Sequence, residues 1–447
     1  MSRPTISAWI AFGIFLSVPI SGAWCLEYPI QAGTHVIFET TTASVNAPAR
    51  GWRYELWVLG ERPPGYEAIW TFHSNVGTPD ETVGGAIPLT ITKSGAKQFP
   101  RQRRATYILE EAIETFMPDL SGVTGFTGTW RGPPVVTGRY HSYQVIGTEG
   151  NLVRCSFAKY GLNKMDQVTG SLVSGEAFFD PAGNWMRRMY MATQMQTPQG
   201  PVLTSEARIR LDKVVQRDAN WITSRREDFL AFQSVLNTHD QELLKANDNL
   251  SSATIAVAPL FGLWQNYFTN HSTSYFYPLA KNHFDVMRAE LPTLGAFWQK
   301  RRAVVGGGAP PWTMQDTQGQ SFSLQSLGGR PILLYFWSMG NWDALMGMRQ
   351  LREFKKAYEG RGLLILPVNM DGNSQAVNQA LGLLEVELPS LMLTDSNLLT
   401  LYGIPIGLVP SSVLIGSDRK VVDVRYGWGL QIFDALQERI EAVLPSG

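Results

Sequence analysis

The stretch PILLYFWSMGNWDALMGMRQLREFKKAYE, residues 331–359, decides the fold of the C-terminal part of this 447-residue chain. Its first seven residues are an uninterrupted apolar run, which is typical of a strand buried on both faces of a sheet. A helix is predicted to follow from about Asn341 to Glu359, because apolar side chains recur there at helical spacing: Leu345, Met348, Leu351, Phe354 and Tyr358. A buried strand that leads directly into such a helix indicates a sheet covered by helices.

The same alternation of strand and helix continues to the C-terminus. Apolar and β-branched runs alternate with helical patterns, and the last two strands form a hairpin across residues 417–420. This order predicts an α/β sandwich around one central sheet. We expect strands at Leu363–Met370, Ser390–Leu393, Ser412–Gly416 and Val421–Tyr426, and helices at Asn373–Leu384, Asn397–Tyr402 and Leu430–Leu444.

Several short motifs follow one another in this part of the chain. They are APPWT at 309–313, PILLYFW at 331–337, GLLILPVNMD at 362–371, LYGI at 401–404 and VPSSVLI at 409–415. In this order and at this spacing they resemble the TlpA/ResA-type thioredoxin-like proteins of the redoxin superfamily. The resemblance covers roughly residues 306–447 and implies a thioredoxin-like fold there, with Pro410 as the family's cis-proline. It implies nothing about the residues that come before.

The start of the first helix departs from the family's pattern. Members that exchange disulfides carry two cysteines there, separated by two residues, and the helix N-terminus stabilises the first thiolate. Counted from the 331–337 strand, the two positions are Asn341 and Ala344, which form neither a thiolate nor a mixed disulfide. We therefore expect a redox-inactive domain. Whether the chain is an enzyme stays open, because Cys25 or Cys155 reaching this site from elsewhere would supply a thiol.

Three residues near the degenerate thiol positions form a candidate binding groove: Met339, Trp342 and Pro410. The resemblance implies that the backbone beside the cis-proline holds an extended peptide, so a peptide or an envelope protein is the expected partner. The opposing interpretation is that Trp342 packs over the helix N-terminus and Pro410 only ends a strand. Asp343 is interpreted as a favourable charge in the first helical turn. No catalytic residue, metal or cofactor is predicted here.

A β-rich domain is predicted for residues 27–215, where strand-forming segments dominate. One short helix is expected at Tyr107–Phe116. The pattern predicts a mostly antiparallel sheet, either a sandwich or a curved half-barrel, and a concave surface of this kind leaves a lipid or small-ligand site open. Strands are expected at His35–Val45, Trp52–Gly60, Tyr66–Asn75 and Ile87–Lys93, and in a meander of Val173–Phe179, Trp185–Gln196 and Val202–Val215.

Residues 216–305 change to helical periodicity and form a predicted helical segment between the two domains. Ser224 and Glu227 have the spacing of a capping box, which predicts the start of its first helix. Two further helices are expected at Ala253–Phe268 and Pro278–Arg302. The glycines at 306–308 are interpreted as a hinge before the thioredoxin-like domain, residues 306–447.

Residues 1–25 have the character of an export signal. Arg3 precedes an apolar run, and the small residues Ser21 and Ala23 follow where a signal peptidase would cut. The alternative is an uncleaved N-terminal anchor, since the apolar stretch is near the ~20 residues that a bilayer span needs. Both interpretations predict an exported, periplasmic or otherwise extracytoplasmic protein, which touches the membrane only if this segment stays uncleaved.

The overall composition excludes several classes of protein. Thirty-eight Lys and Arg balance 38 Asp and Glu, so the chain lacks the excess of positive charge that favours binding to the phosphates of nucleic acid. Two cysteines exclude a disulfide-rich framework and a four-thiolate zinc site. They leave one disulfide to consider, Cys25 with Cys155, although the strand pattern around Cys155 favours a buried, inert thiol. The six histidines show neither close pairing nor zinc-protease spacing.

Three functions follow from these observations. The preferred one is an exported protein whose degenerate thioredoxin-like domain binds a peptide or another ligand, or serves as a scaffold. The second is a thiol-disulfide oxidoreductase or antioxidant protein of the redoxin superfamily that uses a cysteine outside the domain. The third is a lipid or small-ligand carrier built on the β-domain.

Overall fold

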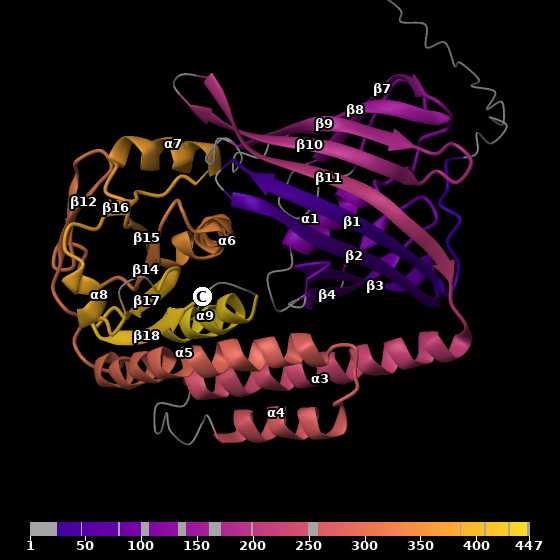
Figure 1. Ribbon diagram of the computed structural model, residues 1–447. Helices are drawn as coiled ribbons and strands as arrows, with labels where there is room; N and C mark the ends of the chain where they lie inside the picture. Colours follow the sequence, from indigo (N-terminus) through magenta and orange to yellow (C-terminus); the bar gives the residue numbers. More distant parts are fainter. Residues whose placement is uncertain are drawn as a thin grey trace, which may run out of the picture.

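The computed structural model describes residues 25–45, 47–78, 81–99, 107–132, 140–160, 171–197, 200–248, 258–384, 386–405, 408–427 and 430–444. Figure 1 shows three parts: a curved β-sheet, a layer of helices along its lower side, and an α/β domain next to both. The predicted fold class, an antiparallel β-domain, a helical middle and a thioredoxin-like C-terminal domain, is confirmed. The N-terminal segment 1–24 lies outside the described residues.

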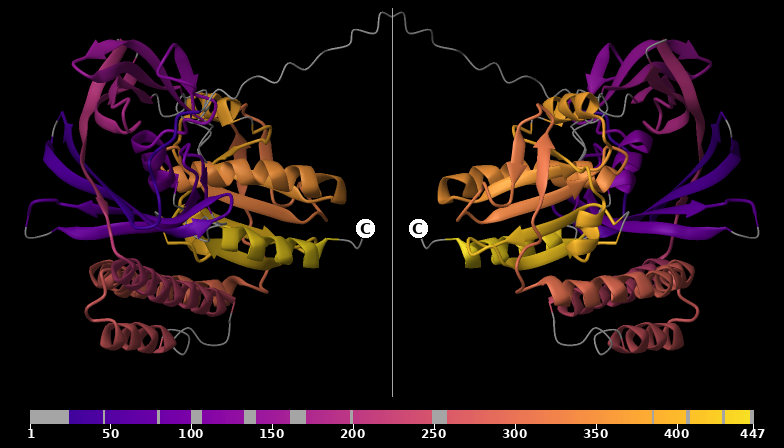
Figure 2. Two further views of the ribbon diagram at one scale, coloured as in Figure 1. Left: turned by 90° about the vertical axis from the view of Figure 1, so that its right-hand side faces the viewer. Right: turned by 90° about the vertical axis from the view of Figure 1, so that its left-hand side faces the viewer.

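The β-rich domain is a single 11-stranded sheet in which every neighbouring pair of strands is antiparallel. The first and last strands, β1 and β11, pair in its middle, and the sheet curves around α1, Tyr107–Phe116 (Figure 2). Of the two predicted shapes, the structure therefore has the curved half-barrel. The strands are β1 Thr34–Ser44, β2 Ala47–Arg62, β3 Gly65–Ser74, β4 Thr82–Ile91, β5 Lys97–Gln98, β6 Thr129–Arg131, β7 Tyr140–Glu149, β8 Leu152–Tyr160, β9 Ser171–Phe179, β10 Met186–Thr197 and β11 Gly200–Gln216.

Part of this sheet is buried on both faces. Successive residues of a strand point to opposite faces, so Leu56 and Val58 of β2 enter the core around α1. Trp57 and Leu59 pack instead against the helical segment. The helical segment thus covers the outer face of this part of the sheet, and α1 covers its inner face.

The helical segment consists of α3 Ala219–Asp248, α4 Ala258–Asn270 and α5 Tyr277–Val304. The predicted start of the first helix at Ser224 is wrong, because the Trp221 amide donates to the Asp218 carboxylate over 2.8 Å and Asp218 caps the helix. Ser224 and Glu227 lie inside α3. Among the described helices, none combines the length and the apolar character needed to cross a bilayer.

The C-terminal domain has a seven-stranded sheet of order β13-β12-β16-β15-β14-β17-β18. The central strand β14 pairs parallel with β15 and antiparallel with β17, and its side chains alternate between two cores. Helices α6, α7 and α9 cover one face. The elements are β12 Thr313–Asp316, β13 Ser321–Ser323, β14 Ile332–Trp337, α6 Trp342–Tyr358, β15 Leu364–Asn369, α7 Ser374–Leu384, β16 Leu391–Met392, α8 Asn397–Leu401, β17 Ser411–Ile415, β18 Val421–Tyr426 and α9 Leu430–Val443, with a 3-10 turn at Glu359–Arg361.

The other face of this sheet is covered by α5, a helix that precedes the predicted domain boundary. Phe297 and Trp298 of α5 belong to the same buried cluster as Trp312, Leu334 and Phe336. A buried ion-pair group adds to this contact, because Arg301 binds Asp423 and donates to the Val424 carbonyl over 2.6 Å.

The glycines at 306–308 do not form a free hinge. The Gly306 amide donates to the Val421 carbonyl over 2.7 Å, and the Val421 amide donates to Gly307 over 2.9 Å. A β-bridge between Gly308 and Lys420 continues this pairing. The segment is therefore tied to the edge strand β18, and the hinge interpretation is corrected.

Candidate functional site at the start of helix α6

The candidate site lies where the parallel strands β14 and β15 end side by side. Asp371, just after β15, holds the loop that follows β14: Ser338 Oγ donates to its Oδ1 over 2.6 Å and the Met339 amide donates to its Oδ2 over 2.7 Å. Asn369 Nδ2 also donates to Asp371 Oδ2, over 3.0 Å. The carboxyl ends of parallel strands are the usual location of ligand sites in α/β sheets.

Asn341 connects this loop to the cis-proline. Its Oδ1 accepts a hydrogen bond from the Ala344 amide over 2.9 Å and so caps α6. Its Nδ2 donates to the Val409 carbonyl over 2.9 Å, and the Val409–Pro410 peptide bond is cis, as the resemblance implied. Both polar ends of the Asn341 side chain are therefore bound within the domain.

The structure brings Asn341, Ala344 and Pro410 together at the start of α6. Ala344 is fully buried and Pro410 is buried, whereas Met339 is half-buried and packs against the core under α6. The side chain of Trp342 lies outside the described residues, so its predicted roles stay predictions.

Sequence reasoning missed Ser338, Asn369 and Asp371. A signal for Asp371 was present, because it directly follows a buried strand that was predicted to lie beside the 331–337 strand. Polar residues at adjacent strand ends meet at one edge of a parallel sheet.

The chemistry available at this site is hydrogen bonding and charge. Residues 306–447 contain no cysteine and no histidine. Burial raises the pKa of Tyr335 well above its ordinary value, with the charge of Asp343 adding to the effect, and its hydroxyl donates to the Ala344 carbonyl over 3.3 Å. Burial followed by the charges of Glu290 and Asp343 likewise raises the pKa of Tyr426. Both tyrosines are therefore neutral at ordinary pH.

The two cysteines are free thiols and lie elsewhere. Cys25 is exposed, and Cys155 of β8 is fully buried in the core around α1. Burial raises the pKa of Cys155 to about 12, which suppresses the reactive thiolate at neutral pH. The disulfide between Cys25 and Cys155 that the sequence left open is not formed in this structure, and Cys155 is the buried thiol that the strand pattern favoured.

A second group of titratable residues lies between the sheet and the helices. His35 Nε2 lies 2.9 Å from Glu55 Oε2, His73 Nε2 lies 3.4 Å from Glu55 Oε1, and the Tyr275 hydroxyl lies 2.5 Å from His73 Nε2. Burial raises the pKa of Glu55, but hydrogen bonds from His35 and Trp57 and the charge of His73 outweigh it and lower the pKa to about 2. Burial lowers the pKa of His73. The histidines, distant in sequence, meet because β1, β2 and β3 are neighbours.

Within the described part of the chain, no three His, Cys, Asp or Glu residues are arranged to hold a metal ion. The His35–Glu55–His73 group is a buried polar network.

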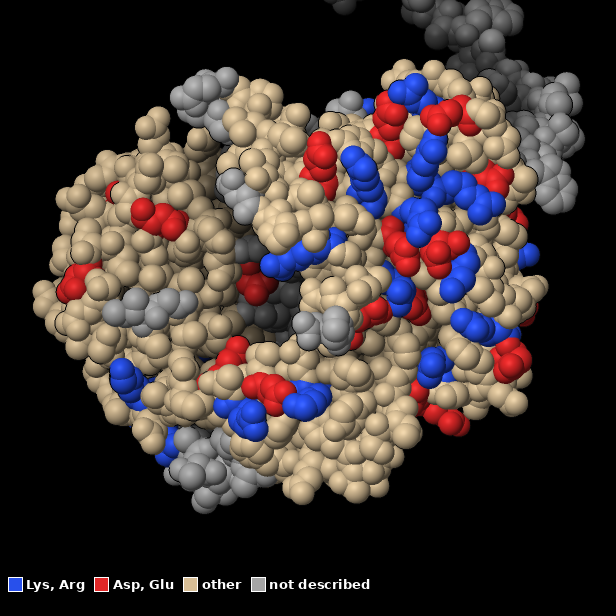
Figure 3. Space-filling view, in the orientation of Figure 1, with Lys and Arg blue, Asp and Glu red and all other residues tan. Residues whose placement is uncertain are grey.

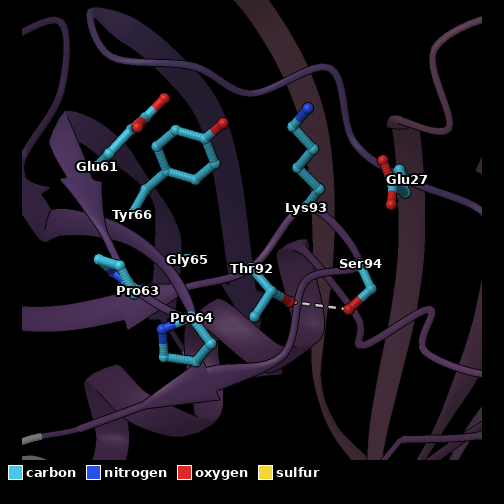
Figure 4. Close-up of a pocket in the computed structure, with 9 residues that line it drawn as sticks. All are labelled: Glu27, Glu61, Pro63, Pro64, Gly65, Tyr66, Thr92, Lys93 and Ser94. Carbon is cyan, nitrogen blue, oxygen red and sulfur yellow. Dashed lines mark hydrogen bonds between the residues drawn. The ribbon is translucent and has the colours of Figure 1, made fainter.

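A polar pocket of about 420 Å³ lies at the turn between β2 and β3 (Figure 4). Glu27, Glu61 and Lys93 line it together with Tyr66, and the hydroxyls of Thr92 and Ser94 lie 2.8 Å apart. These two hydroxyls bind one another, and no histidine lines the pocket to activate them. The pocket thus carries both negative and positive side chains, and its described lining residues include no hydroxyl paired with a histidine base.

The residues that form the α6 site lie within a part of the chain that matches a known protein family. Residues 305–424 match the AhpC/TSA family. The thiol-disulfide oxidoreductase ResA of Bacillus thuringiensis (strain Al Hakam) is 28% identical over 131 residues, which cover 29% of this chain and 73% of the relative. ResA of Bacillus subtilis (strain 168) is 28% identical over 124 residues, 27% of this chain and 67% of the relative.

Two solved structures are each similar to about a third of this chain. The thioredoxin domain of a thiol-disulfide oxidoreductase from Bacteroides vulgatus is 22% identical, with 30% of this chain and 97% of that chain covered and a TM-score of 0.28. A thiol:disulfide interchange protein from Chlorobium tepidum TLS is 19% identical, with 30% and 94% covered and a TM-score of 0.27. The C-terminal part of this chain, residues 305–424, is thus a redoxin domain of the AhpC/TSA family, similar in sequence to the ResA thiol-disulfide oxidoreductases.

Proposed function

We propose that this chain is an exported protein whose redoxin domain is redox-inactive and binds an extended peptide at the face formed by Met339, Trp342 and Pro410. The observation that carries the proposal is the pair Asn341 and Ala344 at the two thiol positions. Disulfide exchange requires a thiolate that attacks a disulfide sulfur, and neither side chain supplies one. Export is inferred from residues 1–25 alone.

The contacts of Asn341 support this reading of the site. Its Oδ1 caps α6 and its Nδ2 donates to the Val409 carbonyl, so this one side chain joins the start of α6 to the residue before the cis-proline. A binding face needs such a rigid arrangement, whereas an exchange reaction needs a reactive sulfur.

The experiment is a thiol-exchange assay with a matched gain-of-function control. The wild-type protein is expected to show no insulin-reducing activity above background. The double variant Asn341→Cys/Ala344→Cys places two thiols two residues apart at a helix N-terminus, and it is expected to form a disulfide and to gain activity. This control shows that the assay and the fold would support the reaction if the thiols were present.

Activity of the wild type that disappears in Cys155→Ser or Cys25→Ser would overturn the proposal in favour of an oxidoreductase that uses a thiol outside the domain. The burial and high pKa of Cys155 argue against that alternative.

A second candidate function is transport of a lipid or small ligand by the β-domain. The indole N–H groups of Trp70 and Trp130 and the Tyr143 hydroxyl are buried in the core around α1 and make no hydrogen bond with any described residue. A buried polar group without a partner costs about 1–3 kcal/mol, so a ligand that supplied an acceptor there would be stabilised. Native mass spectrometry of the purified protein is expected to detect a bound molecule whose occupancy falls in Tyr143→Phe. A protein that is empty in every preparation would contradict this function.

A further inference from the structure

The buried group of His35, Glu55 and His73 joins the sheet to the helices, because both histidines also contact residues from outside the sheet. Arg217, in the link between β11 and α3, donates from Nε and Nη2 to His35 Nδ1 over 3.2 and 3.1 Å. Tyr275, two residues before α5, places its hydroxyl 2.5 Å from His73 Nε2. The two histidines therefore lie at the boundary between the outer face of the sheet and the helical segment.

Each of these contacts changes when its histidine takes up a proton. A guanidinium only donates hydrogen bonds, so His35 Nδ1 accepts from Arg217 and loses this bond if it is protonated. Burial, with the charge of Glu55 adding to it, raises the pKa of Tyr275 well above its ordinary value, so the hydroxyl keeps its proton and can donate it to a neutral His73. A protonated His73 carries hydrogen on both ring nitrogens and cannot accept this bond.

On the sheet side, three charged groups face His73. Glu55 Oε1 lies 3.4 Å from its Nε2 and Glu81 Oε1 lies 3.7 Å from its Nδ1, while Arg53 binds the same Glu81 oxygen over 2.6 Å. Burial lowers the pKa of His73 and the charge of Arg53 adds to this, although the charges of Glu55 and Glu81 oppose it. The two carboxylates therefore do not compensate for the cost of a buried charge on this ring.

On the helical side, the charges near the histidines are cations or are already paired. Arg217 binds His35, and Arg225 of α3 lies with its Cζ 4.7 Å from the centre of the Tyr275 ring. Asp228 of α3 pairs with Arg225 over 3.2 Å and also accepts from the Tyr275 amide over 3.2 Å. A proton added at the histidines thus meets positive charge from the helices.

Solvent does little to screen a charge at this boundary. Figure 3 shows acidic and basic side chains intermixed on the surface of the β-domain, where water and ions weaken their interactions. His35, Glu55 and His73 are instead 4%, 7% and 7% exposed. A change of protonation there acts directly on the contact between sheet and helices.

The remainder of this contact is apolar and is separate from the redoxin core. Trp57 and Leu59 of the sheet belong to one buried cluster with Phe232 of α3. The other end of α5 belongs to the redoxin domain through Phe297 and Trp298. Opening at the histidines therefore separates the helices from the sheet without breaking the redoxin core.

We propose that the His35–Glu55–His73 group makes the contact between the sheet and the helical segment sensitive to acid. Below about pH 6.5, where a free histidine takes up a proton, the contact opens while the redoxin domain stays folded. Glu55 remains charged over this range because its pKa is about 2, so the histidines are the members of the group that change. Opening exposes Trp57 and Leu59 on the outer face of the sheet. This response is independent of what the redoxin domain binds.

Hydrogen–deuterium exchange of the full-length protein at pH 8, 6.5 and 5.5 tests the proposal, with each rate corrected for the intrinsic effect of pH. Each proton taken up on opening raises the opening equilibrium by up to about tenfold per pH unit. Protection of the first half of α3 and of the start of α5 is expected to fall about tenfold between pH 6.5 and 5.5, because helices without tertiary contacts are only marginally stable in water. Protection of β14 and β15 is expected to stay the same.

The double variant His35→Gln/His73→Gln removes both titrating rings and is expected to abolish this loss of protection. His271→Gln is the matched control, since His271 lies after α4 and stacks on Tyr267 outside the group, and it is expected to leave the loss unchanged. Binding of an apolar fluorescent dye to the wild type should rise over the same pH range as Trp57 becomes exposed.

The wild-type profile decides the question even if the double variant fails to fold. Constant protection of α3 and α5 down to pH 5.5 overturns the proposal, and so does an equal loss in the helices and the redoxin strands, which would be general unfolding. A loss that persists in a folded double variant also overturns it, because other groups would then be responsible.

Discussion

At the scale of single residues, Asn341 explains how the redoxin domain keeps its geometry without a thiol pair. An asparagine is among the best helix caps, and it also carries an amide donor that reaches the Val409 carbonyl. The sequence itself shows only that position 341 carries no thiol. The second hydrogen bond forms because Val409, next to the cis-proline, lies beside the start of α6. The residues around Asn341 do not predict that contact.

Replacing Asn341 by alanine is expected to destabilise the redoxin domain by about 2 kcal/mol, because the cap is lost and the Val409 carbonyl loses its donor. Asn341→Ser retains a capping oxygen and loses only the second bond, so it should cost about half as much. Urea unfolding followed by tryptophan fluorescence measures both. Equal losses in the two variants would show that the cap contributes nothing, and an unchanged stability of Asn341→Ser would show that the bond to Val409 contributes nothing.

The Glu55 network predicts a loss of stability in acid. The pKa of Glu55 is about 2 in the folded chain against an ordinary 4.5, so its contribution is complete above pH 4.5 and disappears as the pH falls towards 2. The pKa of His73 is lowered from 6.5, so the unfolded chain takes up this proton first and stability already falls below pH 6.5. Chemical denaturation between pH 8 and 3 is the measurement. Glu55→Gln should flatten the part of the curve below pH 4.5, and an unchanged slope would refute this assignment.

At the scale of elements, β18 joins the helical segment to the redoxin sheet. Asp423 of this strand is buried between Arg301 of α5 and Arg425, with Arg425 Nε 2.6 Å from its Oδ2. Charges buried in this way depend on one another, because each guanidinium without its carboxylate would be an uncompensated charge in the interior.

Asp423→Asn is therefore expected to destabilise the protein by about 3–5 kcal/mol. The matched control is Glu441→Gln, which breaks the exposed Arg361–Glu441 pair with its 2.7 Å contact and should lower the stability far less than Asp423→Asn, because solvent screens this pair. Denaturant midpoints of the two variants provide the comparison. Similar midpoints would mean that the buried group does not hold α5 against the sheet.

At the scale of the whole molecule, the redoxin domain shares a core with the helix before it. Phe297 and Trp298 are almost fully buried against Trp312 and the even-numbered side chains of β14. A fragment 306–447 lacks both aromatic side chains, and each large core truncation of this kind costs about 3–5 kcal/mol. We expect it to unfold at a clearly lower urea concentration than a fragment 277–447. Equal midpoints would show that α5 adds no stability to the redoxin sheet.

Local patterns in the sequence predicted the helices and strands, and the sequence itself shows that positions 341 and 344 carry no cysteine. The run at residues 331–337, the helical stripe after it and the meander that ends near residue 215 all form as predicted, because periodicity is a property of neighbouring residues. The absence of cysteine after residue 155 is likewise a fact of the chain itself.

Only the tertiary structure decided which distant residues meet. The pairing of His35 and His73 around Glu55 and the ion pair of Arg301 with Asp423 depend on contacts between residues far apart in the chain. The glycines at 306–308 read as a hinge because glycine is locally permissive, yet hydrogen bonds to β18 hold them in place. Long-range packing overrides a local preference whenever it satisfies backbone groups and buries apolar surface together.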